Sequence, residues 1–230
     1  MSDKALVNSK VENIYSLTPL QEGMLFHNLY NKNSTDYVLQ NILSVDYDLS
    51  TENVKTALRL LSKRFSVLRT LFFYQKIDKP QQIVLKDRKI EYEIIDLSSS
   101  TSNCLKKEIN KIIKDDLHRN FDLQFDSLLR LNMIKMPDHK SKLIWTMHHI
   151  IVDGWCTGKL FKKFFEYYSR LCNGESEEDI LNEINSELIS SASFSDYTSL
   201  PLARSNGLRN SVISSSSDSL LVVYSKSAST

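Results

Sequence analysis

The sequence lacks most of the features that mark disulfide-rich, metal-binding, secreted or membrane proteins. Only three of its 230 residues are cysteines, and Cys104, Cys156 and Cys172 are widely spaced. Such an odd, scattered set suits free thiols in a reducing compartment better than a disulfide framework or a metal site. Apolar runs stay well below the ~20 residues that span a membrane. Residues 1–10 lack the apolar segment of a signal peptide. We therefore expect a cytoplasmic protein without a membrane segment.

Two further classes are poorly supported. The formal net charge is only +1, and no basic run interleaved with aromatic residues occurs, which argues against a nucleic-acid surface. The chain has five glycines and contains neither a Gly-x-Ser-x-Gly elbow nor a glycine-rich phosphate loop. A serine or cysteine nucleophile therefore has no sequence support, and Cys156 is expected to be a packing residue.

What is present is typical of a globular protein, with 41% apolar and 25% charged residues. Hydrophobic periodicity predicts helices and strands that intermix along the chain. Strands are expected at residues 37–47, 68–74, 82–85, 90–95, 128–136 and 142–150, and helices from residue 18 and at 50–65, 103–117, 155–171 and 175–189. Residues 86–89 are expected to close a hairpin. The order indicates an α/β or α+β fold with a mixed sheet flanked by helices.

The two ends of the chain differ from the middle. Residues 1–13 are polar and are expected to be a flexible segment, with docking of another subunit as the weaker interpretation. Residues 14–197 carry the periodic pattern. Residues 198–230 are rich in serine and lack periodicity, so we expect a disordered tail. Its short apolar segment, residues 220–224, would be an aggregation-prone strand if exposed.

The most informative stretch is a buried strand that runs into two adjacent histidines, His148 and His149, followed by Asp153 and Gly154. Adjacent strand residues point to opposite faces, so the two imidazoles are poorly placed to hold one metal ion. We expect one histidine to act as a base or positioning group and the other to pack structurally. Asp153 is expected either to pair with an arginine or to cap the following helix. His27 is more simply a partly exposed helix residue than a catalytic one.

Five stretches, in order, resemble motifs of the condensation domains of non-ribosomal peptide synthetases. Residues 148–154 match the HHxxxDG signature in full, and residues 15–27 resemble the opening motif. Residues 64–72 resemble the arginine motif, usually R-H-E-x-L-R-T-x-F, and two further stretches are residues 121–130 and 194–197. In combination these motifs are specific, and they cover most of residues 12–197.

The resemblance implies a chloramphenicol-acetyltransferase-like fold, in which two similar halves form a V around a tunnel. It also implies a reaction of secondary metabolite biosynthesis. An amine on the phosphopantetheine of one peptidyl carrier protein attacks the thioester carbonyl on another, and an amide forms. The expected partners are carrier proteins and other synthetase domains or subunits. No cofactor or metal is expected to be bound by this chain itself.

The resemblance also assigns roles to residues. His149, the second histidine of the signature, would be catalytic as base or as positioner of the amine. Support of the site is implied for the remaining matched positions, which are His148, Asp153, Gly154, Arg64 and Arg69. The arginine motif departs from the usual pattern at Phe65 and Ser66, so any role of those two positions is in doubt.

A full condensation domain is about twice as long as this chain. The tail at residues 198–230 does not resemble the second half, so we expect a truncated, N-terminal half-domain with an uncovered apolar face. A frameshift or early stop in a longer gene would produce such a tail. Three functions stay open: an amide-forming enzyme that is inactive alone, a non-catalytic remnant that binds carrier proteins, and a coenzyme A-dependent acyltransferase. The opening motif disfavours the last.

Overall fold

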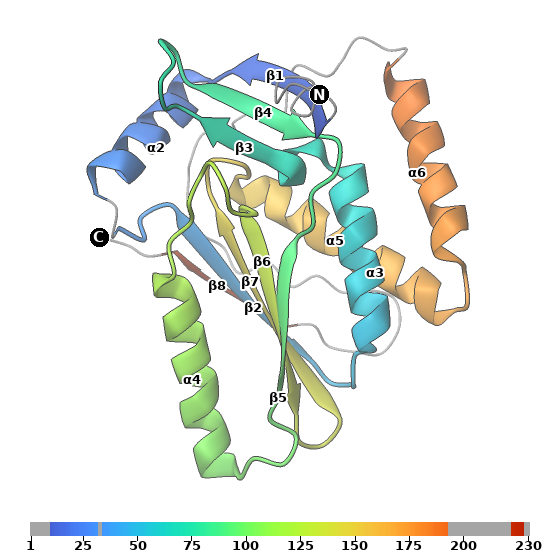
Figure 1. Ribbon diagram of the computed structural model, residues 1–230. Helices are drawn as coiled ribbons and strands as arrows, with labels where there is room; N and C mark the ends of the chain where they lie inside the picture. Colours follow the sequence, from blue (N-terminus) through green and yellow to red (C-terminus); the bar gives the residue numbers. More distant parts are fainter. Residues whose placement is uncertain (1–9, 32–33, 193–221, 228–230) are drawn as a thin grey trace, which may run out of the picture.

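The computed structural model describes residues 10–31, 34–192 and 222–227, and these residues form two sheets with helices packed around them (Figure 1). The larger sheet has the strand order β5-β6-β7-β2-β8. Its strands are β5 (Glu91–Asp96), β6 (Leu129–Met136), β7 (Lys140–His148), β2 (Val38–Val45) and β8 (Val222–Ser227). β5 and β6 are parallel and the other neighbours are antiparallel, so the predicted mixed sheet is confirmed.

Helices cover both faces of this sheet, and consecutive side chains of the central strands β6 and β7 are buried on both sides. One face packs against α3 (Thr51–Arg64) and α5 (Gly154–Cys172), and α6 (Glu177–Ala192) lies beside α3. Trp145 of β7 is fully buried there, edge-on to Phe161 and Phe164 of α5. The other face packs against α4 (Ser102–His118), through Ile109 and Ile144. The sheet therefore has two separate cores.

The smaller sheet is antiparallel and consists of β1 (Val11–Ser16), β4 (Gln81–Leu85) and β3 (Thr70–Phe73), in that order. A 3-10 turn, η1 (Ser66–Arg69), leads into β3. α2 (Pro19–Tyr30) follows β1 and begins with the predicted capping box. The Thr18 hydroxyl accepts from the Gln21 amide, and the Gln21 side chain accepts from the Thr18 amide at 2.9 Å. Within the described residues no helix is long and apolar enough to cross a bilayer.

The predicted hairpin at residues 86–89 is wrong. β4 pairs with β1 and β3, whereas β5 pairs with β6 in the other sheet. The link is held by Arg88, whose guanidinium donates to the carbonyl oxygens of Thr70, Phe125 and Asp126. The link therefore crosses from one sheet to the other, and Arg88 supplies donors to carbonyl groups along it.

The two ends also differ from expectation. Residues 11–13, expected to be flexible, belong to β1. Residues 222–227, in the segment expected to be disordered, form β8, which pairs antiparallel with β2 from Leu39↔Ser227 to Ser44↔Val222. The outer edge of β2 offers unpaired backbone groups, and this apolar segment supplies partners for them. The motif at residues 194–197 lies outside the described residues.

The pairing of β8 leads to a test of solubility. Deleting residues 221–230 should leave β2 as an open edge strand, because its outer N–H and C=O groups lose their partners. We expect the shortened chain to self-associate, which light scattering after size-exclusion chromatography would detect. A shortened chain that stays as monodisperse as the full chain would show that β8 does not protect this edge.

Candidate functional site

His148 is the last residue of β7 and one of the most buried polar side chains, at 2% exposure. Its amide donates to the carbonyl oxygen of Leu128 at 3.0 Å. Its ring Nδ1 lies 3.1 Å from the amide nitrogen of Ile150. Since an amide N–H can only donate, Nδ1 accepts, and the neutral ring carries its proton on Nε2. His148 thus fixes the start of the turn that follows β7.

Aromatic rings surround this imidazole. Phe121 meets it edge-on and Tyr37 lies tilted against it, each with its ring centroid 6.2 Å away. Burial, and then the neighbouring His149, lower the pKa of His148 from 6.5 to about 4. The ring is therefore neutral at physiological pH. It is suited to structural packing, which is the part expected for one of the two histidines.

His149 is less buried and is held differently. Its amide donates to the carbonyl oxygen of Tyr37 at 2.7 Å, which joins the turn to the residue before β2. Its Nδ1 is buried yet has no hydrogen-bond partner among the described residues. A buried unpaired nitrogen is rare in folded proteins and calls for an explanation. The strand expected to extend through His149 to residue 150 ends at His148, and the two imidazoles lie in different surroundings.

Asp153 caps α5. Its carboxylate accepts from the amide of Cys156 at 2.8 Å, which is one of the two roles left open by the sequence. No arginine partner for it occurs among the ion pairs of the residues that the structure describes. Gly154 is the first residue of α5, and a Cβ added there would meet no atom within 4 Å. Packing within the described chain thus does not require glycine, and space is left open beside the corner.

The opening motif reaches the same corner. The Gln21 side chain, which completes the cap of α2, also donates to the carbonyl oxygen of Ile150 at 3.3 Å. His27 of α2 is exposed, as expected, and its ring lies 6.0 Å from that of Tyr37. A cavity of about 10 Å³, the size of one water molecule, lies among these side chains. It is lined by His27, Asn28, Ser34, Tyr37, Val38, Asn120, Phe121 and His148.

The two arginines of the second motif have structural partners away from the histidines. Arg69 is buried and donates to the carbonyl oxygens of Leu85, Ser62 and Lys63. It also forms an ion pair with Glu12 of β1 at 2.7 Å, so it joins the small sheet to the end of α3. Arg64 forms an ion pair with Glu187 of α6 at 3.0 Å. Among the described residues neither arginine forms a hydrogen bond or ion pair with the corner, so any support they give it acts through the packing of α3 and the small sheet.

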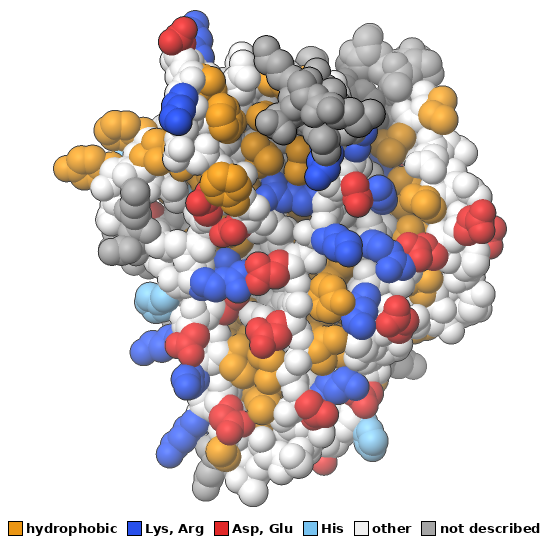
Figure 2. Space-filling view, in the orientation of Figure 1, with side chains coloured by type: hydrophobic (Ala, Val, Ile, Leu, Met, Phe, Trp, Pro, Cys, Tyr) orange, Lys and Arg blue, Asp and Glu red, His pale blue; other side chains and the backbone are white. Residues whose placement is uncertain are grey.

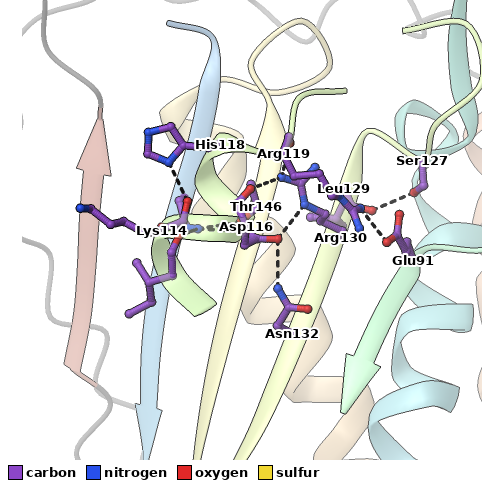
Figure 3. Close-up of polar contacts among 12 residues, drawn as sticks. Glu91, Lys114, Asp116, His118, Arg119, Ser127, Leu129, Arg130, Asn132 and Thr146 are labelled. Atoms are coloured by element: carbon purple, nitrogen blue, oxygen red, sulfur yellow. Dashed lines mark hydrogen bonds and ion pairs between the residues drawn. The ribbon is translucent and has the colours of Figure 1, made fainter. Parts of the chain in front are cut away.

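Sequence reasoning missed a buried polar network beside the corner (Figure 3). Asp116 of α4 accepts from Arg130 at 2.7 Å, Asn132 at 3.0 Å and Gln40 at 2.9 Å, and also from the Thr146 hydroxyl. Burial alone would raise the pKa of Asp116. The hydrogen bond from Thr146 and the ion pair with Arg130 outweigh it and hold that pKa below its usual range. The carboxylate is therefore ionised at neutral pH.

Comparisons with known proteins identify the family that this chain resembles. The family model for the condensation domain matches residues 11–182. Tyrocidine synthase 2 of Brevibacillus parabrevis is 37% identical over 164 residues, which are 71% of this chain and 5% of that protein. Surfactin synthase subunit 3 of Bacillus subtilis (strain 168) is 35% identical over 162 residues, 70% of this chain and 13% of that protein.

Solved structures give the same fold. The starter condensation domain of rhizomide synthetase superposes with a TM-score of 0.66 at 18% identity, over 78% of this chain and 46% of that one. The first condensation domain of the CDA synthetase gives a TM-score of 0.65 at 17% identity, over 72% and 41%. This chain thus spans less than half of each solved domain, and a small fraction of each synthase.

The buried, neutral state of His148 makes stability depend on pH. Its pKa is about 4 in the folded chain and near 6.5 in the unfolded chain, so the unfolded chain binds more protons between these values. The contribution of the neutral His148 ring to the free energy of unfolding is fully present above pH 6.5. It should fall by roughly 3 kcal/mol as the pH drops to 4.

Urea unfolding of the parent and of His148→Asn at several pH values tests this. Asparagine keeps an acceptor near the position of Nδ1 and cannot titrate in this range. The variant should therefore lose this part of the pH dependence. An unchanged difference in stability between parent and variant from pH 7 to pH 4 would show that His148 is not buried as a neutral ring.

Proposed function

This chain belongs to the condensation-domain family of non-ribosomal peptide synthetases, and we propose that it carries the histidine-bearing half of an amide-forming site. In the proposed reaction an amine attacks a thioester carbonyl on a second carrier protein. The C–N bond forms, the C–S bond breaks, and the thiol leaves with a proton. His149 is the residue that accepts a proton from the attacking amine or holds the amine in position.

The observation that carries this proposal is the contrast between the two histidines. His148 has both its amide and its Nδ1 engaged in holding the turn, and its low pKa keeps it neutral. His149 has a buried Nδ1 without a partner among the described residues. Because Nδ1 is buried, a substrate amine reaches this imidazole through its other ring nitrogen, Nε2, which can take up a proton or a hydrogen bond.

The surroundings of the corner support the same proposal. The first turn of α5 is capped by Asp153, and the open space at Gly154 leaves room for a ligand to approach. Gln21 ties the start of α2 to the Ile150 carbonyl oxygen, which limits movement of the turn. Fixing a reacting group in this way reduces the entropy lost on reaching the transition state.

A second possibility, that the chain binds partners without turnover, is favoured by two observations. The chain spans only 41–46% of the solved condensation domains. Apolar side chains also protrude over α2 at the upper left of Figure 2. Phe26 and Tyr30 of that helix stack at 6.1 Å and are 64% and 84% exposed. An exposed aromatic pair next to the candidate site is suited to contact with a further polypeptide.

The two possibilities are separated by reconstitution. We expect the 230-residue chain alone to form no amide from two loaded carrier proteins, because one half cannot preorganise a site that lies between two. Addition of the complementary half of a related condensation domain, as a separate polypeptide, should restore amide formation, measured by mass spectrometry of the carrier-bound product.

In the reconstituted assay His149→Ala should reduce the rate by roughly 10²–10⁴-fold. His139→Ala is the matched control. Its imidazole lies in the turn between β6 and β7 with 93% of the side chain exposed, and it should have no effect. Amide formation that is equally fast with His149→Ala would exclude the proposed role. A complex that assembles but forms no amide would favour the binding function.

A further inference from the structure

Asp116 joins α4 to three neighbouring strands of the large sheet. Its four side-chain donors come from β2 (Gln40), β7 (Thr146) and β6 (Arg130 and Asn132). Gln40 and Arg130 are the register partners of Thr146 on either side, so these three donors form one row across the sheet, and Asn132, the partner of Ile144, lies in the row farther from the corner. A carboxylate that satisfies donors on three strands holds their spacing and register at this point.

The next row on the same face contains the corner. Because side chains alternate along a strand, Thr146 and His148 point to the same face. Val38 pairs with His148 on one side, and Leu128 accepts from the His148 amide on the other. The row held by Asp116 therefore lies directly next to the row in which the buried imidazole ends β7.

A stacked arginine and an aromatic ring connect the two rows. The guanidinium of Arg130 lies over the ring of Phe121, 4.1 Å from its centroid. Phe121 in turn meets the ring of His148 edge-on. Asp116 fixes the orientation of this guanidinium through the bond to Nε. A planar guanidinium held by a carboxylate is a rigid platform for an aromatic ring.

From this arrangement we propose that Asp116 is a positioning residue for the His148–His149 turn, acting through Arg130 and Phe121. By holding Arg130 against Phe121, it keeps the Phe121 ring packed over His148. The covered ring then keeps its Nδ1 directed at the Ile150 amide, and that bond shapes the turn that presents His149. The inference rests on the proposed function for its catalytic meaning, but the positioning itself is measurable without substrate.

The pKa of His148 reports whether Phe121 still shields the His148 ring from water. The titratable and charged groups around the ring are His149 in the same turn, His27 across the cavity, Tyr37 beside it, and the Asp116–Arg130 pair behind Phe121. Loss of a nearby carboxylate would by itself lower the pKa of an imidazole further. Entry of water around the His148 ring, once Phe121 no longer shields it, would raise the pKa of His148. The two effects have opposite signs, so the direction of the shift decides between them.

The experiment is an NMR pH titration of the full chain with labelled histidines, in which His148→Asn assigns the His148 signal. In Asp116→Asn the pKa of His148 should rise from about 4 by about one unit. Arg130→Lys keeps the positive charge but loses the planar stack, and it should give a rise in the same direction. Arg130→Lys therefore still tests the proposal if Asp116→Asn does not fold. Phe121→Leu removes the shielding ring itself and should raise the pKa of His148 at least as much.

Ser141→Ala is the matched control. Ser141 is buried on the same strand, at its other end, and its hydroxyl accepts from the Leu49 amide at 3.0 Å. The control should destabilise the chain without moving the His148 titration. An unchanged or lower pKa in both Asp116→Asn and Arg130→Lys would overturn the proposal. An equal rise in Ser141→Ala would also overturn it, because the effect would then be general loosening.

Discussion

The architecture around the candidate site depends on the hydrogen bond from the Ile150 amide to Nδ1 of His148. An imidazole buried at a strand end is tolerated only if its polar atoms are satisfied. This bond satisfies Nδ1, fixes the tautomer of the ring, and forms the first hydrogen bond of the turn after β7. Asp153 then starts α5 by capping it. The chain thus changes from strand to helix within a few residues.

The surroundings of the two histidines differ. His148 is neutral and engaged, so it contributes shape, whereas His149 retains a buried nitrogen without a partner in the described chain. Much of the surrounding structure supports this arrangement from behind. α5 packs under β7 through Trp145, and α4 holds the other face through Asp116. The corner is therefore largely built from one half of a condensation-domain fold, even though the chain spans less than half of the solved domains.

Sequence reasoning succeeded where local chemistry determines local structure. The capping box at Thr18 and the strand that leads into His148 are both readable from neighbouring residues. It failed where long-range pairing decides. β1 is mostly exposed and has no alternating pattern, so nothing in it indicates a strand. Residues 86–89 look like a turn, yet Arg88 holds them between sheets.

Asp116 was missed for a related reason. It lies three residues after Ile113 on the inward side of α4, where a charged residue is costly unless partners are present. A carboxylate on an apolar helix stripe, together with Arg130 in an apolar strand, is the signal that was available. The sequence does not state that the two meet, because the pairing depends on how α4 packs on the sheet.

The central claim, that one half of the domain fixes His148 and so presents His149, is tested most directly by the tautomer of His148. Imidazole ¹⁵N chemical shifts of the labelled chain at pH 7 report which ring nitrogen carries the proton. The bond from Ile150 predicts a neutral ring with the proton on Nε2 and a bare Nδ1. A proton on Nδ1, or a charged ring at this pH, would contradict the account.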